Sequence, residues 1–413
     1  MEIVHTRCAG LDISKRDAKL CLRLPGKRAG TFTRKVTTWG ATTRQILALR
    51  DLLVEAEVTV VALEATGDYW KPFYYLFEDV LNVMLVNPRH VKNVPGRKTD
   101  VSDCQWLADL AAHGLVKACL VPPEPIRRLR DLTRARTALT RDRARVIQRL
   151  EKLLEDAGIK LSSVATDLTG VSSRGMLDAL IDGRSSPEQM ANLARTSMRS
   201  KIGELTEALH GQFTDHHAFL TRMYLDQIDQ LTPMIDELTT RIETLIAPFR
   251  AARDLLVTIP GVNTLVADVI IAETGADMSV FPTPGHLASW AGVTPGHHQS
   301  ARVTKSAKTR PGDRYLKAAL GVAALAITRT RGNYLNALYK RLAPRRGPSK
   351  AIVAVEHSIL ISVWHMLTRA QPYHDLGADH FTTLNPERIT RRAIHQLEQL
   401  GFTVTLTPTQ NAA

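Results

Sequence analysis

The stretch GRKTDVSDCQWL, residues 96–107, marks the point where the chain changes from strand-rich to helical patterning. It places Asp100 and Asp103 three residues apart, directly behind Arg97 and Lys98. Residues three apart on a helix share one face, so we expect both carboxylates to point the same way. Acidic residues are also favoured in a first helical turn, where they offset the helix dipole and cap free N–H groups. Taken alone, the pair therefore favours ordinary helix capping.

Upstream of this stretch, residues 1–124 have the pattern of an α/β domain. Strand-like runs alternate with polar breaks, and one amphipathic helix follows them: RCAGLDISK, AKLCLRL, AGTFTRKVTT, then TTRQILALRDLLVEA. Two buried strands come next, VTVVALEATG and VMLVNP. Asp12 and Glu64 lie in such apolar strands, where an isolated charge is costly. A bound divalent cation would make both carboxylates tolerable.

Four carboxylates occur in an order that favours metal chemistry: Asp12, Glu64, Asp100 and Asp103. Two Mg²⁺ (or Mn²⁺) ions about 4 Å apart, held by such a set, activate a nucleophile and stabilise the leaving oxygen in phosphodiester chemistry. Any one of the four is ordinary, but the four in this order predict a metal site. We interpret Asp68, in ATGDYW, as a turn residue.

Positive charge is concentrated in two zones of a chain whose net charge is +13. Residues 301–350 hold 13 Lys or Arg and one acid, and residues 126–150 hold nine Arg and two acids. Such zones indicate a polyanionic partner, most simply nucleic acid, although a solvated charged face explains either zone alone. Aromatic residues are only 5% of the chain, which argues against a surface built for stacking bases.

The cysteines and the apolar segments predict a cytoplasmic protein with no membrane contact. Four cysteines occur singly, without a C-x-x-C motif, as expected of reduced thiols. The N-terminus lacks the basic-then-apolar pattern of a signal peptide. The late stretch AIVAVEHSILISVW is interrupted by Glu356 and His357 and is too short to span a bilayer.

Residues 125–250 predict a coiled-coil arm with a helical insert at its tip. Long helices are expected over residues 125–158 and 218–247, because apolar residues recur at 3-4 spacing. Arg136 and Arg143 occupy two seam positions, and Pro233 is a possible kink. Pairing within one chain and pairing between chains would produce the same spacing.

Residues 251–372 predict a second, mostly helical domain, and residues 373–413 a weakly patterned tail. The segment TIPGVNTLVADVIIAETG fits a helix, a Pro-Gly turn and a second helix, as in a helix-hairpin-helix. Such a turn either presents amides to a phosphate or is an ordinary helical corner, and the segment alone favours neither.

Ser300 begins a basic loop in this domain. Serine is a poor nucleophile unless it is activated, and by sequence alone Ser300 is one loop serine with Ser306 as its main rival. The loop cations could bind the phosphates of a strand under attack: Arg302, Lys305, Lys308, Arg310 and Arg314. His297 and His298 lack partners at zinc spacing, so phosphate or loop contacts are the preferred interpretation.

Several motifs together resemble the insertion sequence 110 family of transposases, in order and over nearly the whole chain: GLDISK, ALEATGDYW, NPRHVKNVPGRKTDVSDCQWLADL, IPGVNTLVADVIIAETG and LASWAGVTPGHHQS. The resemblance implies an RNase H-like (RuvC-like) first domain. It assigns an Asp-Glu-Asp-Asp metal site to Asp12, Glu64, Asp100 and Asp103, and the nucleophile to Ser300. Two residues depart from the commonest family pattern, Ala301 in place of Gly and Asp313 in place of Asn.

The resemblance also implies the reaction and the partners. The family cuts and rejoins DNA strands at element ends and targets, guided by an RNA that the element encodes. Homodimers or homotetramers are implied, in which Ser300 of one subunit completes the carboxylate site of another. Arg97 and Lys98 would then contact the phosphate backbone near the metal.

Two alternatives remain open from the residues themselves. A metal-dependent nuclease of the Holliday-junction type would use the carboxylates and water, without a covalent intermediate. A non-catalytic nucleic-acid-binding protein would need only the basic zones.

Overall fold

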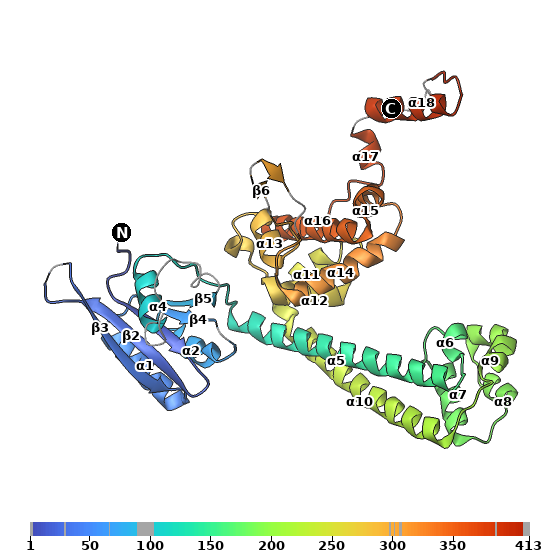
Figure 1. Cartoon of the computed structure of the whole chain (residues 1–413), viewed down its shortest axis with the longest axis horizontal. Helices are drawn as coiled ribbons and strands as arrows, with labels where there is room; N and C mark the ends of the chain where they lie inside the picture. The colour runs from blue at the N-terminus through green and yellow to red at the C-terminus, as the bar shows by residue number, and fades with distance from the viewer. Residues whose placement is uncertain are drawn as a thin grey trace. The chain divides into compact units, whose positions relative to one another are not determined.

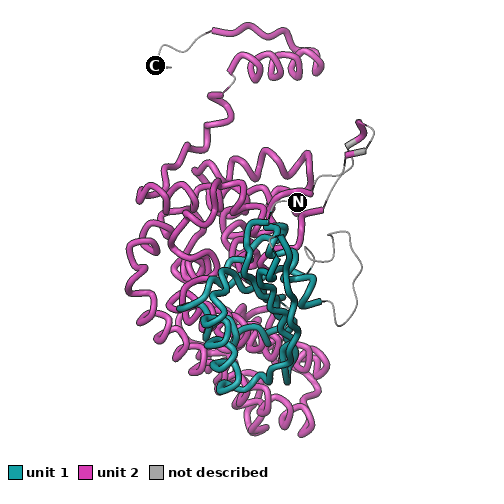
Figure 2. The backbone as a smooth tube through the Cα atoms, turned by 90° about the vertical axis from the view of Figure 1, so that its left-hand side faces the viewer, with its two compact units in different colours: residues 1–121 teal, residues 122–413 magenta. Residues whose placement is uncertain are grey.

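The computed structural model describes residues 3–28, 30–65, 67–88, 103–296, 299–300, 302–304, 308–384 and 386–407. The chain forms two compact units, residues 1–121 and residues 122–413, drawn teal and magenta in Figure 2. The first unit combines a β-sheet with helices, and the second is largely helical (Figure 1). This division into α/β and helical parts agrees with the sequence prediction.

A five-stranded sheet forms the centre of the first unit, with strand order β3-β2-β1-β4-β5. Strand β1 pairs antiparallel with β2 and parallel with β4, while β4 pairs parallel with β5 and β2 antiparallel with β3. The strands fall on the predicted runs: β1 (Cys8–Ile13), β2 (Asp17–Pro25), β3 (Phe32–Gly40), β4 (Val60–Glu64) and β5 (Val83–Val86).

Helices cover both faces of this sheet. Helices α1 (Thr43–Glu55) and α2 (Trp70–Phe77) pack on the face that carries Leu11 and Leu63. Helix α4 (Asp103–Ala112) packs on the opposite face, against Cys8, Val60, Ala62 and Val86. Because side chains alternate along a strand, Gly10 belongs to the α4 face together with Cys8.

Gly10 allows α4 to approach β1 closely. A Cβ atom at Gly10 would lie 2.3 Å from the Cys104 carbonyl oxygen and 2.6 Å from the Ala108 nitrogen. Both obstacles are backbone atoms, so the helix itself would have to shift. Ion pairs hold the helix in the same place, because Asp109 accepts two hydrogen bonds of 2.9 Å from Arg34 and lies 3.3 Å from buried Arg23.

We expect Gly10→Ala to destabilise the first unit by about 1–3 kcal/mol, the usual cost of overpacking a filled interior. Denaturant unfolding followed by fluorescence of Trp39, Trp70 and Trp106 would measure this change. Gly203→Ala is the matched control, because nothing lies within 4 Å of a Cβ added at Gly203. An unchanged midpoint for Gly10→Ala would contradict the close packing of α4 on β1.

Two long antiparallel helices form the arm of the second unit, α5 (Glu124–Asp156) and α10 (Asp215–Leu245), which lie side by side in Figure 1. Helix α10 continues through Pro233. The insert at the tip contains short helices around its own apolar core: α6 (Leu161–Val164), α7 (Val171–Asp182), α8 (Pro187–Ala191), η1 (Thr196–Lys201) and α9 (Ile202–Ala208). Ser186 caps α8 in a capping box with Gln189.

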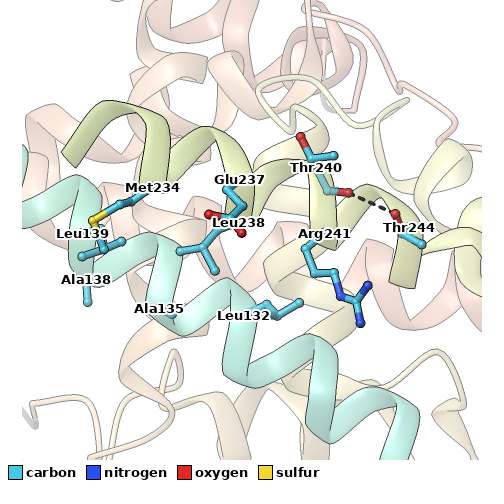
Figure 3. A pocket seen from close by; sticks show the side chains of 10 residues that line it. All are labelled: Leu132, Ala135, Ala138, Leu139, Met234, Glu237, Leu238, Thr240, Arg241 and Thr244. Carbon is cyan, nitrogen blue, oxygen red and sulfur yellow. Dashed lines mark hydrogen bonds between the residues drawn. The ribbon is translucent and has the colours of Figure 1, made fainter. Parts of the chain in front are cut away.

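The packing between α5 and α10 varies along the arm. Near the tip Leu150 and Leu225 are fully buried. Midway along the arm, several predicted seam residues, among them Leu132, Leu139 and Leu238, are only half-buried and line an open apolar groove of about 970 Å³ (Figure 3). Helix pairing is therefore present, whereas coiled-coil packing over the whole length stays a prediction.

The rest of the second unit is a helical domain followed by a tail. Its elements are η2 (Ala247–Phe249), α11 (Arg250–Leu256), α12 (Thr264–Thr274), η3 (Met278–Val280), α13 (Pro284–Ala291), β6 (Gln299–Ser300), β7 (Val303–Thr304), α14 (Arg314–Arg329), α15 (Tyr334–Arg346) and α16 (Pro348–Arg369). The tail carries α17 (His380–Thr383) and α18 (Pro386–Gln399).

The Pro-Gly turn between α11 and α12 packs inside this domain. Gly261 has φ +80°, and a Cβ there would lie 2.6 Å from the Ala323 carbonyl oxygen of α14. Asn263 caps α12 by accepting a hydrogen bond of 2.9 Å from the Val266 amide. Because Gly261 faces α14, the structure favours the helical-corner interpretation of this turn.

Helix α16 is the one helix in the described residues that is long and apolar enough to cross a membrane, at 22 residues. The helix is longer than the apolar stretch read from the sequence. It packs against α13, α14 and α15 and buries Val355, Ile359 and Val363. These contacts place one face of α16 in the core of the helical domain.

Candidate functional site

Asp12 and Glu64 lie at the same level on two neighbouring parallel strands. Leu11 of β1 pairs with Leu63 of β4, and the two carboxylate residues follow at the carboxyl ends of those strands. Asp12 is two residues beyond Gly10, so alternation places it on the α4 face of the sheet. The same rule places Glu64 on that face, two residues beyond Ala62. Both residues are half-buried.

Asp103 approaches the same face from the first turn of α4. The neighbouring Cys104 is buried, and its carbonyl oxygen lies against Gly10 of β1. Burial raises the pKa of the Cys104 thiol, and the negative charge of Asp12 raises it further. This electrostatic effect shows that Asp12 lies near the start of α4. The structure therefore brings three of the four predicted carboxylates to one face of the sheet.

Asp100, Arg97 and Lys98 lie outside the described residues. Within the part of the chain that the structure describes, no group of three or more His, Cys, Asp or Glu is placed to hold a metal ion. Asp68 is exposed and pairs with Lys71 at 3.0 Å, in agreement with its interpretation as a turn residue.

The donor chemistry on the α4 face suits a hard cation. Carboxylate oxygens are the ligands that Mg²⁺ and Mn²⁺ prefer. Buried thiols close by are poor competitors, because burial raises the pKa of Cys21 to about 12 and also raises that of Cys8. Thiols with raised pKa stay protonated near neutral pH in the absence of a metal.

Ser300 lies in the second unit, at the end of β6, where its backbone pairs with Val303 of β7. The hairpin rises from the segment between α13 and α14 (Figure 1). The described cations of the loop are all exposed: Arg302, Lys308, Arg310 and Arg314. The placement of the Ser300 side chain lies outside the described part of the structure, as do His297, His298, Ala301, Lys305 and Ser306.

Sequence reasoning missed a buried cluster of charges beneath this loop. Glu273 of α12 is fully buried and accepts hydrogen bonds of 2.8 and 2.7 Å from Arg134 of α5. Arg130 lies 3.2 Å from the same carboxylate. Arg134 also donates to Asp313 at 3.3 Å. Burial raises the pKa of Glu273, against the lowering effect of its hydrogen bond from Arg134.

A second buried carboxylate, Asp268, joins the same helices. Arg253 lies 3.0 Å and Arg136 lies 3.6 Å from it, both as ion pairs without hydrogen-bond geometry. The seam arginine Arg136 is thus explained by a partner on α12. Arg143, at the other seam position, donates to Thr232 of α10 at 3.3 Å.

Part of the arginine zone of residues 126–150 is therefore structural, while Arg128, Arg141, Arg145 and Arg149 are exposed. Arg130, Arg134 and Arg136 neutralise acids of α12. Arg128 and Arg145 pair with acids of α5 itself, and Arg127 donates to the Pro122 carbonyl just before that helix. The sequence does not reveal this, because Arg134 and Glu273 are 139 residues apart. The signal in the sequence was a pair of acids, Asp268 and Glu273, inside the apolar run LVADVIIAETG.

Two family models match the chain. Residues 9–159 match a model for the DEDD transposases of IS110 elements, described as "Transposase". Residues 253–340 match one described as "Transposase IS116/IS110/IS902 family". The first match contains all four predicted carboxylates, and the second contains Ser300 and its basic loop.

Curated relatives agree with these matches. A "Probable family 20 transposase" from Pseudomonas aeruginosa is 23% identical over 332 residues, covering 79% of this chain and 88% of the relative. A "Transposase for insertion sequence element IS1111A" from Coxiella burnetii is 22% identical over 379 residues, covering 88% and 90%. A "Pilin gene-inverting protein" from Moraxella lacunata is 29% identical over 155 residues, covering 37% and 47%.

The matched models and the carboxylate-bearing sheet define a transposase of an insertion element. The chain belongs to the IS110 family. Membership implies DNA binding together with cutting and rejoining of strands, and the DEDD type of the first domain indicates dependence on a divalent metal.

Proposed function

We propose that this transposase cuts and rejoins DNA with two cooperating groups, a carboxylate-held Mg²⁺ (or Mn²⁺) site and the Ser300 nucleophile. The observation that supports the proposal is that Asp12 and Glu64 end neighbouring parallel strands, on the face of the sheet covered by α4, whose first turn carries Asp103. Strand order 3-2-1-4-5, with β2 antiparallel to its neighbours, supports the RNase H-like (RuvC-like) interpretation of this unit.

The carboxylates would hold the metal, with Asp100 as the fourth ligand. The metal supplies Lewis-acid stabilisation of the charge that develops on phosphate oxygens. Ser300 Oγ forms a bond to phosphorus, the bond from phosphorus to a deoxyribose oxygen breaks, and that oxygen leaves as a hydroxyl. Attack by the hydroxyl of a new strand reverses the step and releases the serine. The exposed loop cations, together with Arg97, Lys98 and Lys305, would hold the phosphates.

The partners follow from the same proposal. They are DNA, as element ends and target, and an RNA encoded by the element. Ser300 and the carboxylates belong to different compact units, and we propose a homodimer or homotetramer in which one subunit's serine meets another's carboxylates. One relative is named for inverting a gene, a rearrangement that requires strands to be cut and rejoined.

Ser300→Ala should abolish a covalent protein–DNA adduct while DNA affinity changes by less than about threefold, because a hydroxyl contributes little to phosphate binding that lysines and arginines dominate. The assay mixes the protein with Mg²⁺, labelled element-end DNA and the flanking transcript, then follows label that stays on protein through denaturation. Ser306→Ala is the matched control in the same loop and should keep the adduct.

Other outcomes would favour the alternatives. Strand cleavage without an adduct in the unsubstituted protein would favour water as the nucleophile, as in a metal-dependent junction nuclease. An adduct lost in Ser306→Ala and kept in Ser300→Ala would move the nucleophile to Ser306.

A further inference from the structure

The loop that carries Ser300 stands on a narrow neck, which we define as residues 292–296 and 308–312. These two segments are joined by the isolated β-bridge between Pro295 and Thr309 and by a 3.1 Å hydrogen bond from the Gly296 amide to the Lys308 carbonyl. At the base of the neck, a Cβ at Gly312 would lie 2.3 Å from the Ala291 carbonyl oxygen. The segments that enter and leave the loop are therefore in backbone contact at its base.

Lys317 of α14 connects the two segments of the neck. Its ammonium group donates to the Gly292 carbonyl at 3.3 Å and to the Thr309 hydroxyl at 3.0 Å. Gly292 lies in the segment before the loop (residues 292–296), and Thr309 lies in the segment after it (residues 308–312). Because an ammonium can donate three hydrogen bonds at once, a single side chain can hold both segments in register.

A buried acid, Glu356, lies near Lys317. Glu356 of α16 is 5% exposed and faces α14, since a Cβ added at Gly321 would lie 3.4 Å from its carboxylate. Burial raises the pKa of Glu356, and the positive charge of Lys317 opposes that effect. Lys317 therefore contacts the neck on one side and lies within electrostatic range of the buried Glu356 carboxylate, without a direct ion pair between them.

The segment after the loop is also connected to the arm, through Asp313 and Arg134. Asp313 follows the neck and caps α14 by accepting hydrogen bonds from the Tyr315 and Leu316 amides at 2.9 and 2.8 Å. Its other oxygen accepts from Arg134 of α5. The Arg134 guanidinium also lies 4.8 Å from the centre of the Tyr315 ring, within cation–π range.

We propose that Lys317 is a positioning residue: its hydrogen bonds hold the two segments of the neck together, so that the loop bearing Ser300 leaves the domain in one fixed direction. Arg134 of the arm supports this arrangement by binding Asp313, which directly follows the neck. The proposal rests on the proposed role of Ser300 as nucleophile. Lys317 itself touches no reacting atom. It acts on the reaction through the placement of the loop, for which an error of about 1 Å is enough to slow a reaction about a hundredfold.

The test compares Lys317→Met/Glu356→Gln with Glu356→Gln alone. Removing both charges avoids leaving a buried carboxylate without its cation. The single variant keeps the ammonium and serves as the matched control. We expect hydrogen exchange at the Gly296 amide to become about tenfold faster in the double variant, because the neck opens locally once the clamp is lost.

The reaction supplies the second measurement. The first-order rate of adduct formation should fall by about tenfold or more, while the Kd for DNA changes by less than about threefold, because placement rather than binding is lost. Lys317→Arg should restore most of the rate, since a guanidinium can also donate to both acceptors. Thr309→Val removes one acceptor at nearly constant shape and should give a smaller fall in rate.

Unchanged exchange at Gly296 in the double variant would overturn the clamp. Equal acceleration of exchange throughout α14 would overturn it as well, because that would be a general loss of stability. If the unsubstituted protein formed no adduct, the serine function would fail, and exchange at the neck would still decide the clamp by itself.

Discussion

Asp12→Asn should reduce strand cleavage by about a hundredfold or more, while the protein remains folded and still binds DNA. The substitution keeps the size and removes the negative charge that a divalent cation requires of its ligand. In the proposed metal site Asp12 would be a ligand, and it lies at the carboxyl end of the central strand and near the first turn of α4. Cleavage rates over a titration of Mg²⁺ and of Mn²⁺ would measure the loss.

Asp68→Asn is the matched control for this prediction. Asp68 lies four residues after Glu64, is exposed, and pairs with Lys71. We expect cleavage by this variant to stay within about twofold of the unsubstituted protein, as for most substitutions of exposed side chains. Equal losses in both variants would contradict the assignment of the metal site to the α4 face. No loss in either would favour a protein that binds nucleic acid without cutting it.

The positions of Asp12 and Glu64 near the ends of buried strands, and of Asp103 at the start of a helix, were predictable because their signals are local, while their role as metal ligands stays a prediction. Apolar residues flank Asp12 and Glu64 along the chain, and Asp103 begins an apolar helix. What brings them together is the parallel pairing of β1 with β4, which strand patterning alone does not specify. The close approach at Gly10 was also hidden, because a glycine in a strand shows no sign of the helix that will cover it.

The basic zone of residues 126–150 shows the limit of a prediction made from charge counts along the sequence. Charge counts predicted a nucleic-acid surface over residues 126–150, yet Arg134 and Arg136 face acids of α12 that are far away in sequence. Periodicity places a residue on a helix face but does not identify the partner of that face. The loop cations that the structure describes, Arg302, Lys308, Arg310 and Arg314, are exposed, so the second zone stays a candidate for phosphate contacts.

Arg134→Met should lower the free energy of unfolding of the second unit by about 3 kcal/mol, the lower end of the range for breaking a buried ion pair. Glu273 is fully buried and would lose both hydrogen bonds from the guanidinium. Arg130 remains 3.2 Å away and compensates part of the charge, which is why we do not expect a larger loss. Denaturant unfolding followed by fluorescence of Trp290 and Trp364 would measure the change.

Two further variants separate the buried charge from the side chain's volume. Arg134→Met/Glu273→Gln removes the buried charge together with its partner, so we expect it to recover much of the lost stability. Arg128→Met is the surface control, because Arg128 pairs only with exposed Glu124, and we expect a change of less than about 1 kcal/mol. If the double variant were no more stable than Arg134→Met, packing of the arginine stem rather than neutralisation of Glu273 would join the arm to the serine-bearing domain.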